Sequence, residues 1–333
     1  MKAFIKAISY YLPDKILTNQ ELTQRFPEWT VEKVATKIGI DQRHIAAQDE
    51  FVSDMAVKAA EKLFAEHAIA PEEVDFILLC TQSPDYFLPT TACLVQDRLQ
   101  IPTSAGALDF NLGCSGYIYG LALAKGLLAG GIAKNVLLLT SEVYSKHIHE
   151  ADKGNATIFG DAASATLISS SGFAEIQQFD LGTDGAGGKN LIVKQGALKH
   201  PIRSDEEVVL EDGSIQRPAH LYMNGSEIFN FTIDRIPGLV TRTLELNNLQ
   251  MEDIKLYVFH QANKFMLNHL RMKMGIESER FYVHMKNCGN TVSATIPIAL
   301  LEAMKEGIPQ QNDEFLLAGF GVGYSWGACT IRF

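Results

Sequence analysis

The feature of this sequence that most restricts its fold is an order of apolar and helix-like segments that occurs twice. A short apolar run at 74–80 precedes a helical stretch at 92–99, and a run at 254–260 precedes a helical stretch at 264–274. Alternation of this kind predicts a layered α/β architecture.

The match extends, in the same order, to two further pairs of segments: 105–130 with 282–304, and 135–143 with 314–326. Three matched pairs separated by about 180 residues predict a duplicated fold and not a solenoid, whose repeats are far shorter. We therefore expect two fused, pseudo-symmetric domains, one over residues 1–172 and one over residues 173–333.

Two of the expected helices lack a polar face. The helix over 115–130 is apolar or small on every side except at Lys125, which indicates burial on all sides. Close approach of other backbones would explain the three glycines that lower its helix propensity, Gly116, Gly120 and Gly126. The matching helix over 292–304 is similarly apolar. Two buried helices between two sheets predict five layers, α/β/α/β/α.

Composition narrows the classes of function. The net charge of −10 argues against a nucleic-acid-binding protein. No run approaches the roughly 20 apolar residues of a membrane span, and the first residues do not resemble a secretory signal. Five cysteines without a CxxC pair disfavour a disulfide framework and a zinc site. We expect a cytoplasmic protein that binds neither nucleic acid nor membrane and holds no metal.

Cys114 lies between Gly113 and Ser115, where a strand is expected to end and a buried helix to begin. Unpaired backbone N–H groups and the helix dipole at such a position favour the thiolate, which attacks acyl groups. The alternative is a buried cysteine that serves only packing, which we adopt for Cys80, Cys93 and Cys329. Cys288, beside the second-half turn, has at most a minor role.

His260 ends the apolar run at 254–259, where a side chain can emerge at the carboxyl edge of a sheet. A buried structural histidine is the alternative there. Asn290 follows Gly289 just before the second buried helix, and an asparagine at that place can simply be an N-cap. The duplication predicts that the N-termini of both buried helices meet near the pseudo-twofold axis. That geometry would bring Cys114, His260 and Asn290 together.

With these residues in place, nearly the whole chain resembles the β-ketoacyl-acyl-carrier-protein synthase III family of the thiolase superfamily. The motifs that carry the resemblance are LP at 12–13, IGIDQRHIA at 38–46, the Cys114 turn, HQAN at 260–263, GNTVSATIP at 289–297 and GFGVGYSWGACTIRF at 319–333. The resemblance implies a thiolase-like five-layer fold with two pseudo-symmetric halves.

The resemblance also implies a reaction. Cys114 takes an acyl group from acyl-CoA, malonyl-acyl-carrier protein loses CO₂, and its carbanion attacks the acyl-cysteine to give 3-oxoacyl-acyl-carrier protein. His260 and Asn290 would donate hydrogen bonds to the enolate. The oxyanion of acyl transfer would be bound by the backbone N–H of Cys114 and of Val322 or Gly323. No cofactor is implied, because the CoA thioester is a substrate.

Family resemblance further implies a homodimer in which Leu88 lines the acyl pocket of the partner. Initiating members carry a tryptophan and an arginine that grip CoA where this chain has Lys33 and Lys37, and Trp29 lies four residues too early. These departures, and the small Leu88, point away from acetyl-CoA and towards a longer, branched or aryl acyl group.

A basic face for an acidic carrier protein is expected from Lys264, Arg271 and Lys273 on the helix after HQAN, with a solvated helix face as the alternative. We expect charge reversal at Arg271 to raise the apparent KM for malonyl-carrier protein. The polar stretch 182–220 is expected to be a surface excursion, which either lines a binding site or is a plain loop.

Two alternative activities use the same thioester chemistry. One is a specialised secondary-metabolism synthase, including one that accepts its acyl group from a carrier protein. The other is an acyltransferase that forms an ester or amide without decarboxylation.

Overall fold

Ten strands form the frame of the molecule in the computed structural model, which describes residues 2–210 and 215–333. The first half of the chain supplies five of them: β1 (Ala3–Tyr11), β4 (Phe76–Cys80), β5 (Gly106–Phe110), β6 (Asn135–Glu142) and β7 (Ala162–Ser169). The second half supplies the other five: β8 (Ala174–Thr183), β13 (Ile254–Phe259), β14 (Phe281–Tyr282), β15 (Glu314–Gly321) and β16 (Ser325–Arg332).

Both sets of five strands have the same order and the same directions. The first set runs β5-β4-β6-β7-β1 and the second β14-β13-β15-β16-β8. In each, one strand lies parallel to two neighbours (β4 and β13), and the next two pairings are antiparallel. The predicted duplicated α/β fold is confirmed. The predicted boundary at residue 172 falls between β7 and β8, and the division into two domains stays a prediction.

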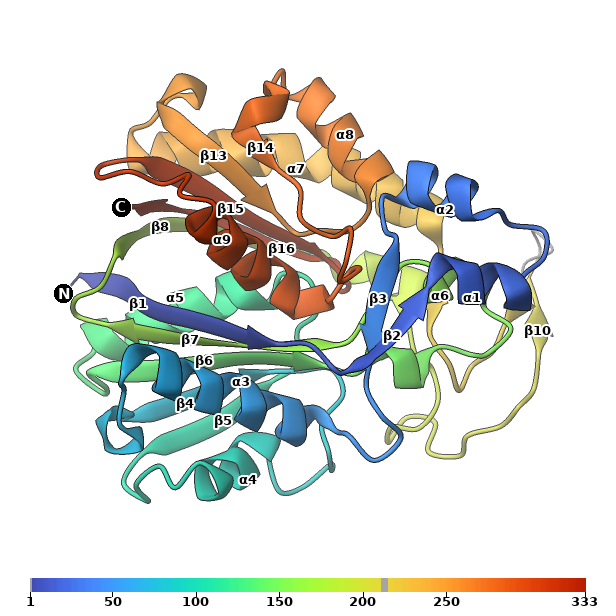
Figure 1. Cartoon of the computed structure of the whole chain (residues 1–333), viewed down its shortest axis with the longest axis horizontal. Coiled ribbons are helices and arrows are strands. Elements are labelled where there is room, and N and C mark those ends of the chain that lie inside the picture. The colour runs from blue at the N-terminus through green and yellow to red at the C-terminus, as the bar shows by residue number, and fades with distance from the viewer. Residues whose placement is uncertain (1, 211–214) are drawn as a thin grey trace.

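The two expected sheet layers are continuous with each other. Strand β1 pairs antiparallel with β8 between Ala3–Ile5 and Ala174–Ile176, which joins the halves into one ten-stranded sheet. Without this pairing each five-stranded set would end in a strand with unpaired backbone groups on one side, and the pairing satisfies three residues of each strand. Figure 1 shows the two halves diverging from this seam, so that they enclose a central layer.

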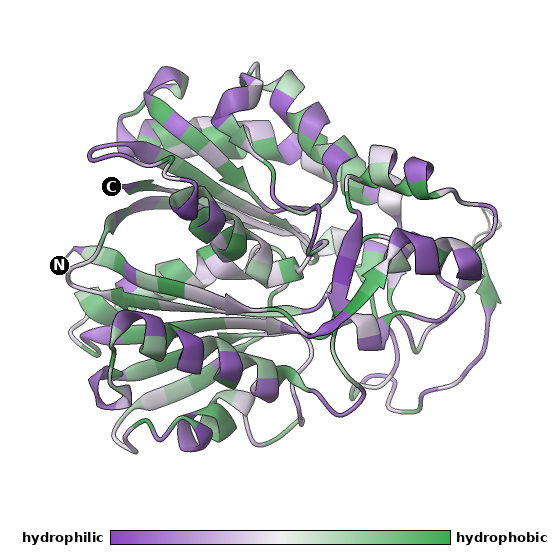
Figure 2. Cartoon of the chain, viewed as in Figure 1, coloured by the Kyte–Doolittle hydropathy of each residue, from purple (hydrophilic) through white to green (hydrophobic). Residues whose placement is uncertain are grey.

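Helices complete the five layers, which are confirmed. The outer layer of the first half contains α3 (Val52–His67) and α4 (Thr91–Arg98), and that of the second half contains α7 (Gly225–Asn247) and α8 (Lys264–Lys273). The central layer contains α5 (Gly116–Ala129) and α9 (Thr295–Lys305), which contact strands of both halves (Figure 1). Figure 2 shows apolar residues concentrated on the strands and the central helices.

The two central helices differ in burial. All residues of α9 from 295 to 300 are buried, whereas α5 exposes Leu123 on one flank, so the prediction of complete burial is wrong for α5. A Cβ on Gly116 would lie 2.2 Å from Cys80 Sγ and one on Gly120 2.5 Å from Leu138 Cδ1, so the close neighbours of these two glycines are side chains and not the predicted backbones. Gly126 is exposed, and outside its chain neighbours and its own helix backbone no atom of the described residues lies within 4 Å of a Cβ placed on it.

One end of the molecule carries smaller elements that lie beside the carboxyl edges of the central strands (Figure 1). They are β2 (Lys15–Thr18), α1 (Asn19–Arg25), α2 (Val31–Ile38), β3 (Gln42–Ile45), α6 (Lys153–Ala156), β9 (Leu191–Ile192), β10 (Val208–Val209), β11 (Ile215–Gln216) and β12 (Tyr222–Met223). Six short 3₁₀ turns complete the described elements: η1 (Pro71–Glu73), η2 (Tyr144–His147), η3 (Gly185–Asn190), η4 (Met251–Asp253), η5 (Ser278–Arg280) and η6 (Val292–Ala294).

The excursion predicted at 182–220 is confirmed in outline, although β8 continues to Thr183; four of its residues, 211–214, lie outside the described residues. Among the described helices, none is both long and apolar enough to cross a membrane.

Candidate active site

Three predicted residues line one cavity at the junction of the two halves. Cys114, His260 and Asn290 all border a space of about 160 Å³ and are themselves buried, with exposed fractions of 6%, 2% and 4%. Cys114 comes from the N-terminus of α5 in the first half, and the other two come from loops of the second half. The cavity therefore exists only when both halves are assembled.

Cys114 packs against two glycines of β15. A Cβ on Gly321 would lie 2.8 Å from Cys114 Sγ, and one on Gly319 would lie 2.8 Å from the Cys114 carbonyl oxygen. Burial raises the pKa of the Cys114 thiol to about 12, and the nearby Glu142 carboxyl adds to the increase. Desolvation therefore opposes the predicted preference for the thiolate, which stays a prediction.

Two backbone N–H groups oppose this increase in the pKa of the Cys114 thiol. Hydrogen bonds from the N–H of Val322 and of Cys114 itself lower the pKa of the thiol in part. Of the two candidates for the second oxyanion donor, Val322 is therefore the one whose N–H reaches the sulfur. Its role in binding an oxyanion stays a prediction.

His260 follows β13 and is held by the first turn of α9. Its Nδ1 lies 2.8 Å from Thr295 Oγ1, and the Thr295 hydroxyl donates to the Val292 carbonyl at 3.0 Å. Because a hydroxyl has one proton, the Thr295 oxygen is left to accept from Nδ1–H, and Nε2 carries the lone pair. Burial lowers the pKa of His260 to about 3, with the Val292 carbonyl opposing, so the imidazole is neutral.

Asn290 has its side-chain amide fixed in one orientation. Oδ1 accepts the Val292 N–H at 2.9 Å, which leaves the Nδ2 hydrogens as donors, and one of them makes a long contact of 3.4 Å to the Ala262 carbonyl. Val292 makes this possible with a φ of +56°, a strained conformation for a β-branched residue. The N-cap alternative for Asn290 is wrong, because α9 begins at Thr295.

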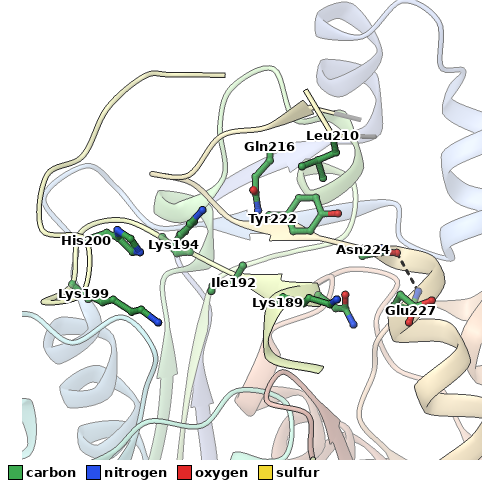
Figure 3. A pocket seen from close by; sticks show the side chains of 13 residues that line it. Lys189, Ile192, Lys194, Lys199, His200, Leu210, Gln216, Tyr222, Asn224 and Glu227 are labelled. Atoms are coloured by element: carbon green, nitrogen blue, oxygen red, sulfur yellow. Dashed lines mark hydrogen bonds between the residues drawn. The ribbon is translucent and has the colours of Figure 1, made fainter. Parts of the chain in front are cut away.

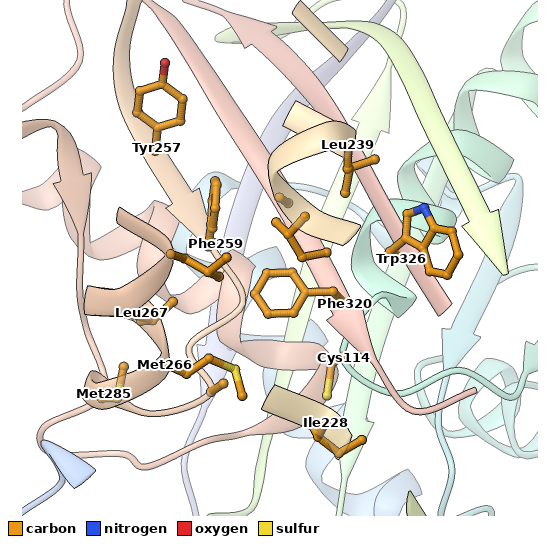
Figure 4. Close-up of a cluster of buried hydrophobic side chains, with 14 of the residues drawn as sticks. Cys114, Ile228, Leu239, Tyr257, Phe259, Met266, Leu267, Met285, Phe320 and Trp326 are labelled. Carbon is orange, nitrogen blue, oxygen red and sulfur yellow. The ribbon is translucent and has the colours of Figure 1, made fainter. Parts of the chain in front are cut away.

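Most of the remaining cavity wall is apolar, apart from Thr232 and Asn263, and was not anticipated from the sequence. Its largest contributors are Phe159, Leu191, Met223, Ile228, Met266 and Phe320. In Figure 4, Phe320 lies at the centre of the buried cluster, with Cys114 and Ile228 on one side and Met266 and Leu267 on another. These residues come from five separate segments, so no local sequence pattern marks them as one wall.

A second cavity of about 790 Å³ adjoins the first, and Met223 and Gly225 border both. Trp29 and the basic side chains Lys153 and Arg217 line it. Trp29 lies before α2, which starts at Val31, and is therefore not on the same helix as Lys33. Its ring instead lies 5.2 Å from the Lys33 ammonium group.

A third cavity of about 950 Å³ lies on the other side of the β9–β12 ribbon (Figure 3). Ile192 and Tyr222 border this cavity, whereas their ribbon neighbours Leu191 and Met223 border the cavity that contains Cys114. Three lysines line it: Lys189, Lys194 and Lys199. No group of histidine, cysteine, aspartate or glutamate side chains suited to a metal ion occurs within 2–210 and 215–333.

The remaining predicted residues lie outside the Cys114 cavity. Leu88 is 82% exposed on the loop between β4 and α4. Lys264 is exposed at the start of α8, next to Asn263, which lines the cavity. On the same helix, Arg271 donates to the Ile276 carbonyl at 2.8 Å, and Lys273 lies nine residues after Lys264, on the opposite side. Their predicted roles stay predictions.

Comparison with known proteins gives a consistent result. The family model "3-Oxoacyl-[acyl-carrier-protein (ACP)] synthase III" matches residues 108–185, and the model of the C-terminal part of the same family matches residues 244–333. The chain is 36% identical over 323 residues to the β-ketoacyl-[acyl-carrier-protein] synthase III of Clostridium perfringens, covering 97% of this chain and 96% of that one.

Solved structures agree with the sequence relatives. A crystal structure described as a 3-oxoacyl-(acyl-carrier-protein) synthase III superimposes with a TM-score of 0.96 at 49% identity and covers 100% of both chains. The synthase III of Thermus thermophilus gives a TM-score of 0.87 at 35% identity and covers 99% of both chains.

Proposed function

The chain belongs to the 3-oxoacyl-[acyl-carrier-protein] synthase III family, and we propose that Cys114, His260 and Asn290 perform its reaction. Enzymes of this family condense an acyl-CoA primer with malonyl-acyl-carrier protein, with loss of CO₂, and this chain is such an acyl-transferring condensing enzyme. The observation that carries the residue assignment is the shared cavity in which a thiol, an imidazole and an amide are buried together.

Acyl transfer begins with proton removal, since burial keeps the Cys114 thiol protonated. Nε2 of His260 carries a lone pair and accepts that proton. The thiolate sulfur bonds to the acyl carbon, the C–S bond to CoA breaks, and the CoA thiolate takes a proton from solvent. The N–H groups of Cys114 and Val322 donate to the oxyanion that forms in between.

Condensation uses the proton that His260 has gained. Its Nε2–H and the Nδ2–H of Asn290 donate to the thioester oxygen of malonyl-carrier protein. As CO₂ leaves, the electron pair of the broken C–C bond forms an enolate, whose carbon bonds to the acyl carbon. The C–S bond to Cys114 then breaks, and the thiolate recovers the proton from His260. A carboxylate in place of Asn290 would repel the enolate.

The second cavity suits the CoA portion of the donor. It adjoins the cavity of Cys114, and an aromatic ring, Trp29, lines it together with Lys153 and Arg217. An aromatic face can stack on adenine, and basic groups pair with phosphates. In this proposal Trp29, which precedes α2, binds the CoA in place of the family residues that correspond to Lys33 and Lys37 within α2.

The carrier protein is proposed to dock at the start of α8. Lys264 is exposed there, and Phe265, which is 54% exposed, packs against Phe229 and His269. An acidic carrier can pair with Lys264 and cover the aromatic rings. Arg271, engaged within its own helix end, is expected to contribute less than the sequence suggested.

A homodimer and a cytoplasmic location complete the proposal. The consecutive side chains of Tyr86, Phe87 and Leu88 are 62%, 80% and 82% exposed, a run of apolar surface that association of two copies would cover. All five cysteines are free, as expected in a reducing compartment. The two predicted domains would each supply one side of the reaction, the thiol from 1–172 and the donors from 173–333.

The deciding experiment separates the two half-reactions. The protein is incubated with a panel of acyl-CoAs, and the mass of the peptide containing Cys114 is measured. Malonyl-carrier protein is then added and CO₂ is quantified. Acylation followed by CO₂ release is expected. Acylation without CO₂ release would favour the ester- or amide-forming alternative, which the relatives do not favour. No acylation of Cys114 by any donor would refute the proposed nucleophile.

A further inference from the structure

Glu142 is a buried acid that the reaction described above does not use. It is the last residue of β6 and has no exposed surface. Its carboxyl oxygens accept the backbone N–H of Gln82 at 3.2 and 3.1 Å and the Ser293 hydroxyl at 3.2 Å. Gln82 follows β4 in the first half of the chain, whereas Ser293 belongs to the second half, so one side chain connects the two halves.

The turn that Glu142 holds contains the groups that position both hydrogen-bond donors of the condensation. Val292 orients the Asn290 amide, and Thr295 binds His260 Nδ1. Ser293 lies between them in the chain. Cys114, on the other hand, belongs to the half that contains Glu142. The distance from the acyl-cysteine to the donors therefore depends on contacts between the halves, and the Glu142–Ser293 hydrogen bond is one of them.

The surroundings of Glu142 are those of an uncharged carboxyl group. Within 2–210 and 215–333 no cationic side chain pairs with it; the titratable groups that act on it or are affected by it are Cys80, Cys114, Tyr144 and Asp161. Burial raises its pKa well above the ordinary value, with the Gln82 N–H and Ser293 hydrogen bonds opposing. An unpaired buried carboxylate is costly, so the group is retained in its neutral form.

We propose that Glu142 is a positioning residue for the condensation step, which acts as a neutral carboxyl group and holds the turn of Asn290 and Thr295 at the correct distance from Cys114. Acyl transfer uses His260 only to accept a proton and does not use Asn290, so it depends less on the position of this turn. Decarboxylation needs both donors on one oxygen atom. The inference rests on the proposed roles of Cys114, His260 and Asn290.

Three variants test this. Glu142→Leu removes the hydrogen bonds at similar size, Ser293→Ala removes only the connection between the halves, and Glu142→Gln keeps a neutral hydrogen-bonding group. Acylation of Cys114 and CO₂ release from malonyl-carrier protein are measured separately. A misplacement of about 1 Å costs about a hundredfold, so Glu142→Leu is expected to lower CO₂ release by about ten- to a hundredfold and to change acylation less than about threefold. Ser293→Ala should show the same selectivity with a smaller loss, and Glu142→Gln should retain most of both activities.

A second readout reports on charge. The rate of iodoacetamide alkylation of Cys114 is followed against pH, with the modified peptide identified by mass because Cys93 is exposed. Because Gln is as neutral as the protonated carboxyl group, Glu142→Gln should leave the profile unshifted wherever Glu142 is neutral. A shift of the profile to lower pH would show that Glu142 is a charged group and would overturn its proposed neutral form.

Glu302→Gln serves as the matched control, since Glu302 is a partly exposed acid on α9 that accepts a hydrogen bond from Tyr10 outside the cavity. It should change neither half-reaction. If Glu142→Leu does not fold, Ser293→Ala decides. Equal losses in both half-reactions, or an unchanged CO₂ release in the folded variants, would overturn the inference. A failure of the unsubstituted enzyme to acylate Cys114 would instead overturn the proposed nucleophile.

Discussion

Gly321 provides a direct test of where the sulfur of Cys114, the proposed nucleophile, lies. A Cβ at this position would be 2.8 Å from Cys114 Sγ and 2.9 Å from Cys114 Cβ, whereas unstrained contacts of this kind lie at about 3.5–4.0 Å. Gly321→Ala must therefore displace the sulfur or β15 by roughly 1 Å. A displacement of that size costs about a hundredfold in rate, or about 2.7 kcal/mol of transition-state stabilisation.

The assay is the time course of Cys114 acylation by an accepted acyl-CoA, followed by intact mass before steady state. Gly321→Ala is expected to slow it by about a hundredfold, with a loss of stability of about 1–3 kcal/mol from overpacking. Gly126→Ala is the matched control, because the added carbon would meet no described atom within 4 Å outside its own helix backbone and chain neighbours; it should keep the acylation rate and raise helix propensity. If the Gly321→Ala variant is acylated as fast as the unsubstituted protein, this placement of the Cys114 sulfur is refuted.

Three further predictions concern the donors and the carrier. Thr295→Val removes the acceptor of the His260 Nδ1–H and should lower CO₂ release by about tenfold without unfolding the protein. Unchanged CO₂ release would show that Thr295 does not position His260. Burial lowers the pKa of His260 from 6.5 in the unfolded chain to about 3 in the folded protein. Between these pH values the unfolded chain binds one more proton than the folded protein. The free energy of unfolding should therefore fall as the pH decreases through this range, by up to about 1.4 kcal/mol per pH unit. His260→Gln should flatten this slope in chemical denaturation, and an identical slope would contradict the assignment. Lys264→Glu should raise the apparent KM for malonyl-carrier protein with little change in acylation by acyl-CoA, whereas Lys273→Glu, on the opposite side of α8, should have little effect on either.

Much of the fold followed from local patterns, because each half repeats the same apolar runs and these became β4, β6, β13 and β15. The β1–β8 pairing did not, since nothing in the composition of two edge strands indicates that they face each other across 170 residues of chain. Complete burial of α5 was also inferred from composition alone. An apolar helix surface indicates that something covers it, but not that the cover belongs to the same chain.

The candidate site divides in the same way. Cys114, His260 and Asn290 stand in short motifs, so the sequence could single them out. Thr295 and Glu142 could not be found, because their relevance depends on which side chains meet after the halves pack together. The desolvation that opposes ionisation of Cys114 was missed for a related reason: the helix N-terminus is visible in the sequence, whereas the depth of burial is a property of the assembled fold.

The seam between β1 and β8 has a consequence for synthesis of the protein on the ribosome. β1 emerges first, yet its partners are β7 at 162–169 and β8 at 174–183. For half of translation, this apolar strand has no native neighbour, and the first sheet cannot close around it. Such delayed pairing of distant segments slows folding and exposes strand edges to aggregation. The nascent chain is therefore expected to depend on a holding chaperone until about half of it has been translated. By then β7 can pair with β1, and the second half folds against a first set of strands that is already complete.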